Sequence, residues 1–292
     1  MITEAYLIPE TLEQCLEALE SYRGEASIIA GGTDFMLALK EKKIAVQAIV
    51  DITRIPELLT LEFRGDSFYI GAGVTHGRVA VHERVRKIFP ALAESCMSVG
   101  SPQIRNIATL LGGNVVSAQP AADSSIALVA LGARAQIVSS GGQRTELVEN
   151  LYAGVGQSKV DPRREVLTGF ILPLPVPESG NAFTRFAPRE ALALPIVSAA
   201  ACITLAEGCI RQARICIGPV AVHPFRPLQA EQNLLGKRAE DNAALEEAAV
   251  IASQEAKPRD SLLRGSGKYR QALVRDLVYR ALASAVKKAT ED

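Results

Sequence analysis

The sequence predicts an α+β protein in two parts, and three observations support this class. Helix and strand signals alternate up to the segment Leu172–Asn181. That segment carries three prolines at alternate positions, which hold the backbone extended and block a helix, so we interpret it as a linker. After it, an apolar hairpin is followed by consecutive helices, a pattern typical of the α+β class. We therefore expect a first domain over residues 1–175, built of two α/β subdomains, and a second domain over residues 176–292.

The first elements form a helix–strand–helix–strand series. Thr11-Leu-Glu-Gln14 is a capping-box pattern that predicts a helix start. The apolar residues of this helix share one face, and they are Leu12, Cys15, Leu16 and Leu19. Ser27–Ala30 is a short apolar strand that ends at Gly31-Gly32. A helix over Phe35–Lys42 and a strand over Val46–Ile52 are expected next.

The middle of the chain continues the alternation. Leu61–Arg64 and Phe68–Gly71 flank Gly65-Asp66-Ser67, which predicts a hairpin. The remaining patterns of this part are three helices and one strand: helices over Arg78–Val85, Pro90–Val99 and Asp123–Leu131, and a strand over Arg134–Val138.

The part after the linker begins with two long apolar segments, Val197–Ala206 and Cys209–Gly218, joined at Glu207-Gly208. This arrangement predicts an antiparallel hairpin. Three helices are expected to follow, over Pro227–Leu235, Ala243–Ala256 and Gly267–Val286. In the last of them an apolar stripe alternates with charged residues, and it consists of Leu273, Leu277, Ala281 and Ala285.

Composition and charge exclude several classes of protein. Lysine and arginine total 32, as do aspartate and glutamate, so the formal charge is zero and gives no electrostatic reason to bind nucleic acid or an anionic membrane. The longest apolar run, Ile126–Ala133, is far shorter than the ~20 residues of a membrane helix. The opening Met-Ile-Thr-Glu-Ala-Tyr lacks the basic and apolar regions of a secretory signal, so we expect none.

The cysteines and histidines give no sign of a metal or disulfide site. Five cysteines without a CxxC pair fit a reducing cytoplasm better than a disulfide framework, so we expect a cytoplasmic protein. The three histidines never stand at metal-ligand spacing, and no metal ligand is predicted. His76 and His82 are interpreted as surface or loop residues rather than catalysts, and no catalytic residue is assigned.

Two glycine pairs are the candidate binding features. Ile28–Phe35 is a strand, a glycine turn and a helix start, where free amides and close backbone approach can hold a phosphate or pyrophosphate. A plain turn capped by Thr33 or Asp34 is the alternative. Thr109–Asn114 holds the second pair, and two such loops in one domain suggest that both close on one long ligand.

These two glycine loops are among the segments in which the sequence resembles the FAD-binding medium subunit of the molybdenum hydroxylases, the family of xanthine dehydrogenase and carbon monoxide dehydrogenase. The resemblance covers nearly the whole chain and depends on the order and spacing of seven segments. They are Ala30–Asp34, Gln103–Asn106, Thr109–Asn114, Pro120–Ser124, Arg185–Arg189, Val197–Ala201 and Tyr269–Leu282. It implies a flavin-binding fold of the vanillyl-alcohol-oxidase (PCMH) type, followed by a small C-terminal α+β domain of an antiparallel sheet plus helices.

The resemblance also implies a set of FAD-binding residues. The first glycine loop cradles the pyrophosphate, and its residues are Ile28, Ile29, Ala30, Gly31, Gly32, Thr33, Asp34 and Phe35. The second lies by the flavin and its ribityl chain, with Thr109, Gly112, Gly113 and Asn114. Four further positions stand near the cofactor: Val99, Asp123, Leu167, and Arg185 in place of a lysine. The sequence departs from the family pattern at two places. Two residues, Leu110 and Leu111, stand between Thr109 and the second glycine pair where the family usually has one, and Leu192 stands where several relatives carry aspartate.

In enzymes of this family, a molybdenum subunit oxidises the substrate and a small subunit with [2Fe–2S] clusters relays single electrons. The resemblance implies that FAD in this chain collects them and passes them to NAD+, a quinone or another acceptor. Two alternatives stay open from the residues: a flavin-free assembly subunit, and a flavoprotein that acts without a molybdenum partner.

Overall fold

Helices and sheets are distributed over two packed units in the computed structural model, which describes residues 3–110 and 115–291. Unit 1 contains the described residues of 1–79, 102–119 and 133–173. Unit 2 contains residues 80–101, 120–132 and the described residues of 174–292. The chain therefore leaves each unit and returns to it more than once, and each unit is described by itself.

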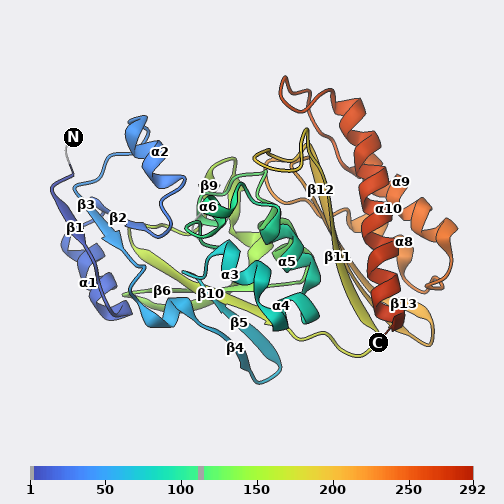
Figure 1. The fold of residues 1–292 in the computed structure, drawn as a ribbon, viewed down its shortest axis with the longest axis horizontal. Coiled ribbons are helices and arrows are strands. Elements are labelled where there is room, and N and C mark those ends of the chain that lie inside the picture. The colour runs from blue at the N-terminus through green and yellow to red at the C-terminus, as the bar shows by residue number, and fades with distance from the viewer. Residues whose placement is uncertain (1–2, 111–114, 292) are drawn as a thin grey trace. The chain divides into compact units, whose positions relative to one another are not determined.

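A three-stranded parallel sheet begins unit 1, with the order β1–β3–β2. Its strands are β1 (Ala5–Leu7), β2 (Ala26–Ile29) and β3 (Ala48–Asp51). Helix α1 (Leu12–Ser21) connects β1 to β2, and α2 (Phe35–Lys40) connects β2 to β3 (Figure 1). The predicted helix start is confirmed, since the Thr11 hydroxyl accepts from the Gln14 amide at 3.2 Å. The reciprocal bond differs from that of a capping box, because the Gln14 side chain accepts from the amide of Glu10, at 2.8 Å, and not from that of Thr11.

The larger sheet of unit 1 is antiparallel, with the order β4–β5–β10–β6–β7. Its strands are β4 (Leu61–Arg64), β5 (Ser67–Gly71), β6 (Arg134–Ser139), β7 (Gly142–Leu147) and β10 (Glu165–Pro173). Short elements complete the unit: η1 (Pro56–Leu59), α6 (Pro102–Arg105), η3 (Val148–Leu151), β8 (Tyr152–Gly154) and β9 (Gln157–Ser158). Fully buried Phe68, Ile137 and Phe170 pack in the core of this unit.

Unit 2 is built on the antiparallel sheet β11–β12–β13. Its strands are β11 (Ser179–Phe186), β12 (Val197–Ala206) and β13 (Cys209–Gly218), and its last helices are α8 (Leu228–Leu234), α9 (Asn242–Glu255) and α10 (Gly267–Glu291). Helix α10 runs along the sheet (Figure 1), and its buried stripe packs with β12 in one core. Helices α4 (Glu83–Ile88), α5 (Pro90–Met97) and α7 (Asp123–Ala130) belong to this unit too.

Several elements differ from those predicted. The helix expected over Arg78–Val85 is two helices, α3 (His76–Val81) and α4, because His82 between them has extended backbone. The linker is shorter than Leu172–Asn181, since β10 reaches Pro173 and β11 begins at Ser179. The helices expected to end at Lys42 and Val99 end at Lys40 and Met97. Strand β1 and the five strands from β7 to β11 were not among the predicted elements.

Two general properties bear on function. Among the residues that the structure describes, no helix combines the length and apolar character of a bilayer span. All five cysteines are described, and none of them forms a disulfide.

Candidate cofactor site

The first glycine loop joins β2 to α2 in unit 1. Gly32 has a φ of +70°, a backbone conformation that favours glycine. Gly31 lies directly against the backbone of residues 107–108, because a Cβ added to it would stand 2.2 Å from the Ile107 carbonyl oxygen. The two glycines thus have different structural roles: Gly32 permits the turn, and Gly31 permits close packing against the segment that leads to Thr109.

This loop presents a run of amides that the protein itself does not use. Within the described part of the chain, no acceptor receives a hydrogen bond from the amide groups of residues 31–34. Two of the loop carbonyls are occupied, since those of Gly32 and Asp34 accept from Met36 and Ala38 at 2.9 and 3.0 Å. Consecutive free amides in a glycine turn form a concave donor surface for an anion.

The amides border a cavity of about 620 Å³ that lies wholly within unit 1. Its lining comes from the β2–α2 region, from Glu41–Ile52 in part, from the segment after the second glycine pair and from Gly156–Leu167 in part. Among the lining residues are Ser27, Ile28, Ile29, Ala30, Gly31, Gly32, Thr33, Asp34, Phe35, Thr109, Ser117, Val160 and Leu167. The structure therefore brings together all of the predicted residues from Ile28 to Phe35 with Thr109 and Leu167.

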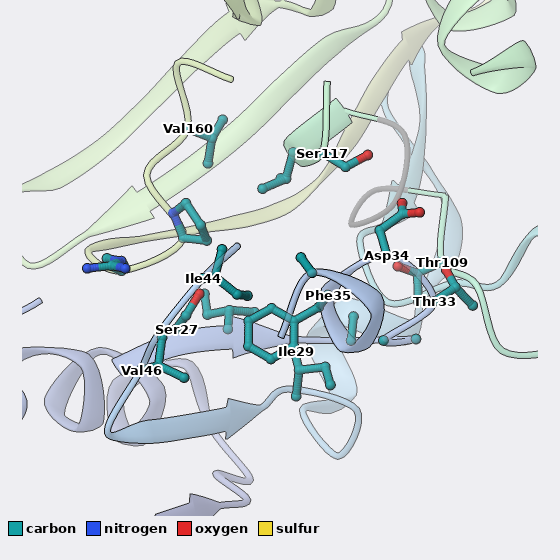
Figure 2. Close-up of a pocket in the computed structure, with 18 of the residues that line it drawn as sticks. Ser27, Ile29, Thr33, Asp34, Phe35, Ile44, Val46, Thr109, Ser117 and Val160 are labelled. Atoms are coloured by element: carbon teal, nitrogen blue, oxygen red, sulfur yellow. The ribbon is translucent and has the colours of Figure 1, made fainter. Parts of the chain in front are cut away.

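One end of the cavity is polar. Figure 2 shows Thr33, Asp34, Thr109 and Ser117 gathered there, with Asp34 and Ser117 facing the same space. Burial raises the pKa of Asp34 above its ordinary value, and the nearby Ser117 hydroxyl partly offsets this rise. The Asp34 side chain does not cap α2, which removes one form of the plain-turn alternative.

Ser117 was not predicted from the sequence. Its Oγ is buried and forms no hydrogen bond of good geometry among the described residues, although it lies near enough to the Asp34 carboxylate to lower the pKa of that group. A buried hydroxyl without a partner is uncommon, because its lost hydration is not replaced. Because Ser117 lines the same cavity as the free amides, its hydroxyl is suited to a polar group of a ligand. No motif signals a lone serine three residues beyond Asn114, so only the cavity identifies it.

The other end of the cavity is apolar. Phe35, Ile44 and Val46 line it together with the segment around Val160 (Figure 2). Arg163 fixes that segment, since its guanidinium donates to the carbonyls of Gly24 at 2.9 Å and Ala45 at 3.4 Å. The cavity thus offers donors and hydroxyls at one end and an aromatic and aliphatic recess at the other.

Thr109 is held by the start of α3. It forms an antiparallel bridge with Thr75, and the next residue, Leu110, donates its amide to Val74 at 2.9 Å. His76 is buried beside this bridge, and its Nδ1 donates to the Ala108 carbonyl at 2.9 Å. The interpretation of His76 as a surface or loop residue is therefore wrong, and burial lowers its pKa. Its observed role is to hold the backbone next to Thr109.

Six of the predicted residues are not among the described lining of this cavity. Gly112, Gly113 and Asn114 lie outside the described residues. Val99, Asp123 and Arg185 belong to unit 2. There the buried Asp123 carboxylate accepts from Arg185 at 2.9 Å, from Ser198 at 2.6 Å and from Ser98 at 3.0 Å. Asp123 and Arg185 therefore form one buried ion pair. Ser98, which also donates to Asp123, directly precedes Val99 in the chain.

The donor set of the cavity suits a phosphate-containing cofactor with an aromatic ring. Free amides and hydroxyls match a pyrophosphate, and the apolar recess matches a ring system. Among the described residues no cluster of histidine, cysteine, aspartate and glutamate side chains is placed to hold a metal ion.

Comparison with known proteins agrees with this chemistry. Residues 2–175 match the family described as FAD binding domain in molybdopterin dehydrogenase, and residues 182–285 match the CO dehydrogenase flavoprotein C-terminal domain. The chain is 30% identical over 269 residues to the xanthine dehydrogenase FAD-binding subunit of Escherichia coli O157:H7, which covers 91% of this chain and 90% of that one. It is 28% identical over 235 residues to the nicotinate dehydrogenase FAD-subunit of Eubacterium barkeri, 79% of each chain. The structure of quinoline 2-oxidoreductase from Pseudomonas putida 86 superposes with a TM-score of 0.88 at 28% identity, covering 98% of this chain and 97% of that one.

Proposed function

Because the chain belongs to the FAD-binding family of the molybdopterin dehydrogenases, we propose that it is the electron-output subunit of a molybdenum hydroxylase complex. It takes electrons from [2Fe–2S] clusters of a partner subunit and delivers them to NAD+ or another acceptor. FAD is its cofactor. The observation that carries the proposal is the run of free amides at residues 31–34, which faces a cavity inside the matched region.

FAD, when bound, supplies the redox chemistry that accepts electrons singly and releases them as a pair. The protein binds and orients it. The amides of residues 31–34 donate to the pyrophosphate, and the hydroxyls of Thr33, Thr109 and Ser117 donate to its oxygens or to ribityl hydroxyls. Asp34 accepts from a ribose or ribityl hydroxyl, since a carboxylate is a poor neighbour for a phosphate oxygen.

The apolar end of the cavity, lined by Phe35, Ile44 and Val46, takes the adenine ring. The flavin ring has to stay within reach of electron donors and acceptors, so the enclosed recess suits the ring that takes no part in the chemistry. Leu167 supplies an apolar contact to a ring of the cofactor. Gly112, Gly113 and Asn114 hold the flavin and ribityl end in this proposal.

Three residues of unit 2 are proposed to serve the cofactor as well. The Asp123 carboxylate already accepts three hydrogen bonds within the protein. Asp123 and Arg185 therefore act as a pair, in which the carboxylate fixes the guanidinium and the segment that carries Val99. A change in either member alters the placement of the other.

The proposal extends to partners and organisation. Relatives are named as FAD subunits of dehydrogenases, so the partners proposed for this chain are a small [2Fe–2S] subunit and a large molybdopterin subunit. Residues 1–175 form the FAD-binding domain, and residues 176–292 form the C-terminal domain. Five free thiols fit the reducing cytoplasm as the site of action.

The test is a preparation from the native host through an affinity tag on this chain. We expect about one FAD per chain, with iron and molybdenum in the same fraction. After anaerobic reduction by dithionite and removal of the excess, NAD+ or a quinone is added and the visible absorption of the flavin is followed. We expect the oxidised flavin spectrum to return with one of these acceptors.

Three outcomes contradict the proposal, each in a different way. A colourless chain that brings iron and molybdenum is an assembly subunit. A yellow chain that brings neither metal is a flavoprotein that acts alone. A yellow complex whose reduced flavin transfers electrons to neither acceptor, while its iron–sulfur centres do, is not organised for output through FAD.

A further inference from the structure

A turn before α10 in unit 2 presents apolar side chains to solvent. The side chain of Leu263 is 81% exposed and that of Leu262 is fully exposed. The turn is well ordered by its own backbone, because Ser261 and Gly265 exchange amide-to-carbonyl hydrogen bonds at 3.0 and 2.9 Å. Tyr269, 44% exposed, lies beside Gly265, where an added Cβ would stand 3.0 Å from its ring. Adjacent exposed leucines on a fixed turn are typical of an interaction site.

The same segment carries more positive than negative charge, since Arg259, Arg264 and Arg270 are accompanied by one carboxylate, that of Asp260. Arg270 is only 3% exposed, yet it pairs with no carboxylate among the described residues and donates only to the carbonyls of Arg259 and Pro219. Its Nε is buried without a partner in the described structure. Arg264 donates to the Pro195 carbonyl at 3.1 Å and likewise forms no ion pair with a described residue.

Electrostatics make this arrangement unfavourable without an anion. Burial lowers the pKa of Arg270, and repulsion from Arg264 and Arg259 lowers it further. Arg270 also lies in the first turn of α10, where the Asp260 carboxylate accepts from the Gly267 amide at 2.7 Å and so offsets the helix dipole but makes no ion pair with Arg270. A buried charge normally has an opposite charge beside it.

We propose that the surface formed by Arg259–Gly265, Tyr269 and Arg270 docks a partner subunit of the complex, and that the partner presents an apolar recess edged by carboxylates. The inference rests on the proposed function, since it needs a multi-subunit enzyme. The recess covers Leu262 and Leu263, and its carboxylates face the exposed Arg259 and the partly exposed Arg264, while the buried Arg270 adds to the positive charge beneath them. A small inorganic anion would satisfy only the charges and leave both leucines in water. A lipid surface would cover the leucines, but a chain of zero formal charge has no general electrostatic attraction to an anionic membrane.

The variants are chosen so that folding is not affected. The double variant Leu262→Asp with Leu263→Asp changes two side chains that support nothing in the chain. Arg259→Glu reverses an exposed charge while keeping the backbone carbonyl that Arg270 uses. Leu228→Asp is the matched control, because Leu228 is 59% exposed at the start of α8, away from this surface in the sequence.

Each tagged chain is produced with its native partners and purified under identical conditions. We expect the double variant to keep its FAD and to lose partner subunits by about tenfold or more, as for the central contacts of an interface. Arg259→Glu should lose partners to a smaller extent, and more strongly at low salt. Leu228→Asp should match the wild-type chain.

The possible failures are distinguishable. If the wild-type chain holds FAD but brings no partner, the proposed function itself is wrong. If the wild-type chain assembles and the double variant assembles equally well, only the docking surface is wrong. Two further results overturn it: binding of the isolated chain to vesicles of anionic phospholipid that the double variant abolishes while its assembly is unchanged, or a dimer of this chain, seen by light scattering, that the double variant dissociates.

Discussion

At the scale of single residues, the cavity separates groups that serve the protein from groups that serve a ligand. The side chains of His76 and Arg163 donate hydrogen bonds to backbone carbonyls of unit 1. Removal of either side chain would therefore loosen the fold around the cavity. Ser117 and the amides of residues 31–34 contribute no hydrogen bond to the protein. Their hydrogen-bonding capacity is therefore available to FAD.

Ser117→Ala tests this division. Loss of a hydrogen bond to a charged group costs about 1.5–3 kcal/mol, so we expect the Kd for FAD to rise by roughly ten- to a hundredfold. The FAD-free chain should unfold at a nearly unchanged temperature, because the hydroxyl has only its contact with the Asp34 carboxylate to lose. Fluorescence titration with FAD and thermal unfolding measure the two quantities. Ser21→Ala, which removes a hydroxyl bonded only to Ala18 at the end of α1, is the control. An unchanged Kd for Ser117→Ala would remove this residue from the site.

At the scale of elements, local patterns predicted the β2–α2 connection because its strand, glycine pair and helix follow one another in the chain. They did not predict β11, whose residues are set by distant neighbours. Gly180 allows α10 to pack, since an added Cβ would stand 2.0 Å from the Ala285 carbonyl oxygen. Asn181 is buried because it bonds Ile88 and Ala91 of the α4–α5 region at 3.0 and 2.9 Å. Glycine and asparagine weaken a strand pattern, so the reason for this strand lies in its packing.

Gly31→Ala tests the packing of the glycine loop. The new methyl would clash with the Ile107 carbonyl and the Ala108 Cα, 2.2 and 2.8 Å away, and backbone atoms yield little. We expect a loss of about 3 kcal/mol in the free energy of unfolding, near the upper end for overpacking, together with weaker FAD binding. Gly141→Ala is the matched control, because its Cβ would meet only the Ser139 hydroxyl at 3.7 Å. Urea unfolding decides: equal losses in the two variants would show that Gly31 is not a packing glycine.

At the scale of the whole molecule, the sequence order and the packing order are different. The proline-rich segment is visible in the sequence because proline restricts the backbone. The passages of the chain between units near residues 79, 101, 119 and 132 carry no such signal. The pieces that cross, including α5 and α7, are short and almost wholly buried. Their apolar residues indicate burial, and only the three-dimensional structure identifies what buries them.

Hydrogen exchange on the whole chain, with and without FAD, tests how far the site extends. At a free FAD concentration about 100 times Kd, binding contributes about 2.7 kcal/mol, which slows exchange through openings that release FAD by about a hundredfold. We expect this protection in residues 27–46 and 156–167 of unit 1, and at Asp123 and Arg185 if the pair serves the cofactor as proposed.

Helices α8 and α9 provide the internal reference for that experiment, because residues 228–255 line no part of the cavity. Protection limited to unit 1 would contradict the roles proposed for Val99, Asp123 and Arg185. Equal protection over α8 and α9 would indicate general stiffening rather than a bounded site.

The hydrogen bond between Ser98 and Asp123 has a consequence for how this chain could change through evolution. These two residues stand at either end of the excursion through residues 102–119, and the bond ties its entry and exit together at 3.0 Å. Lengthening a closed excursion by one residue costs little free energy. A change of length between residues 102 and 119 is therefore expected to leave the register of the remainder of the protein unchanged. Natural variation in length is expected to accumulate there, between two fixed points.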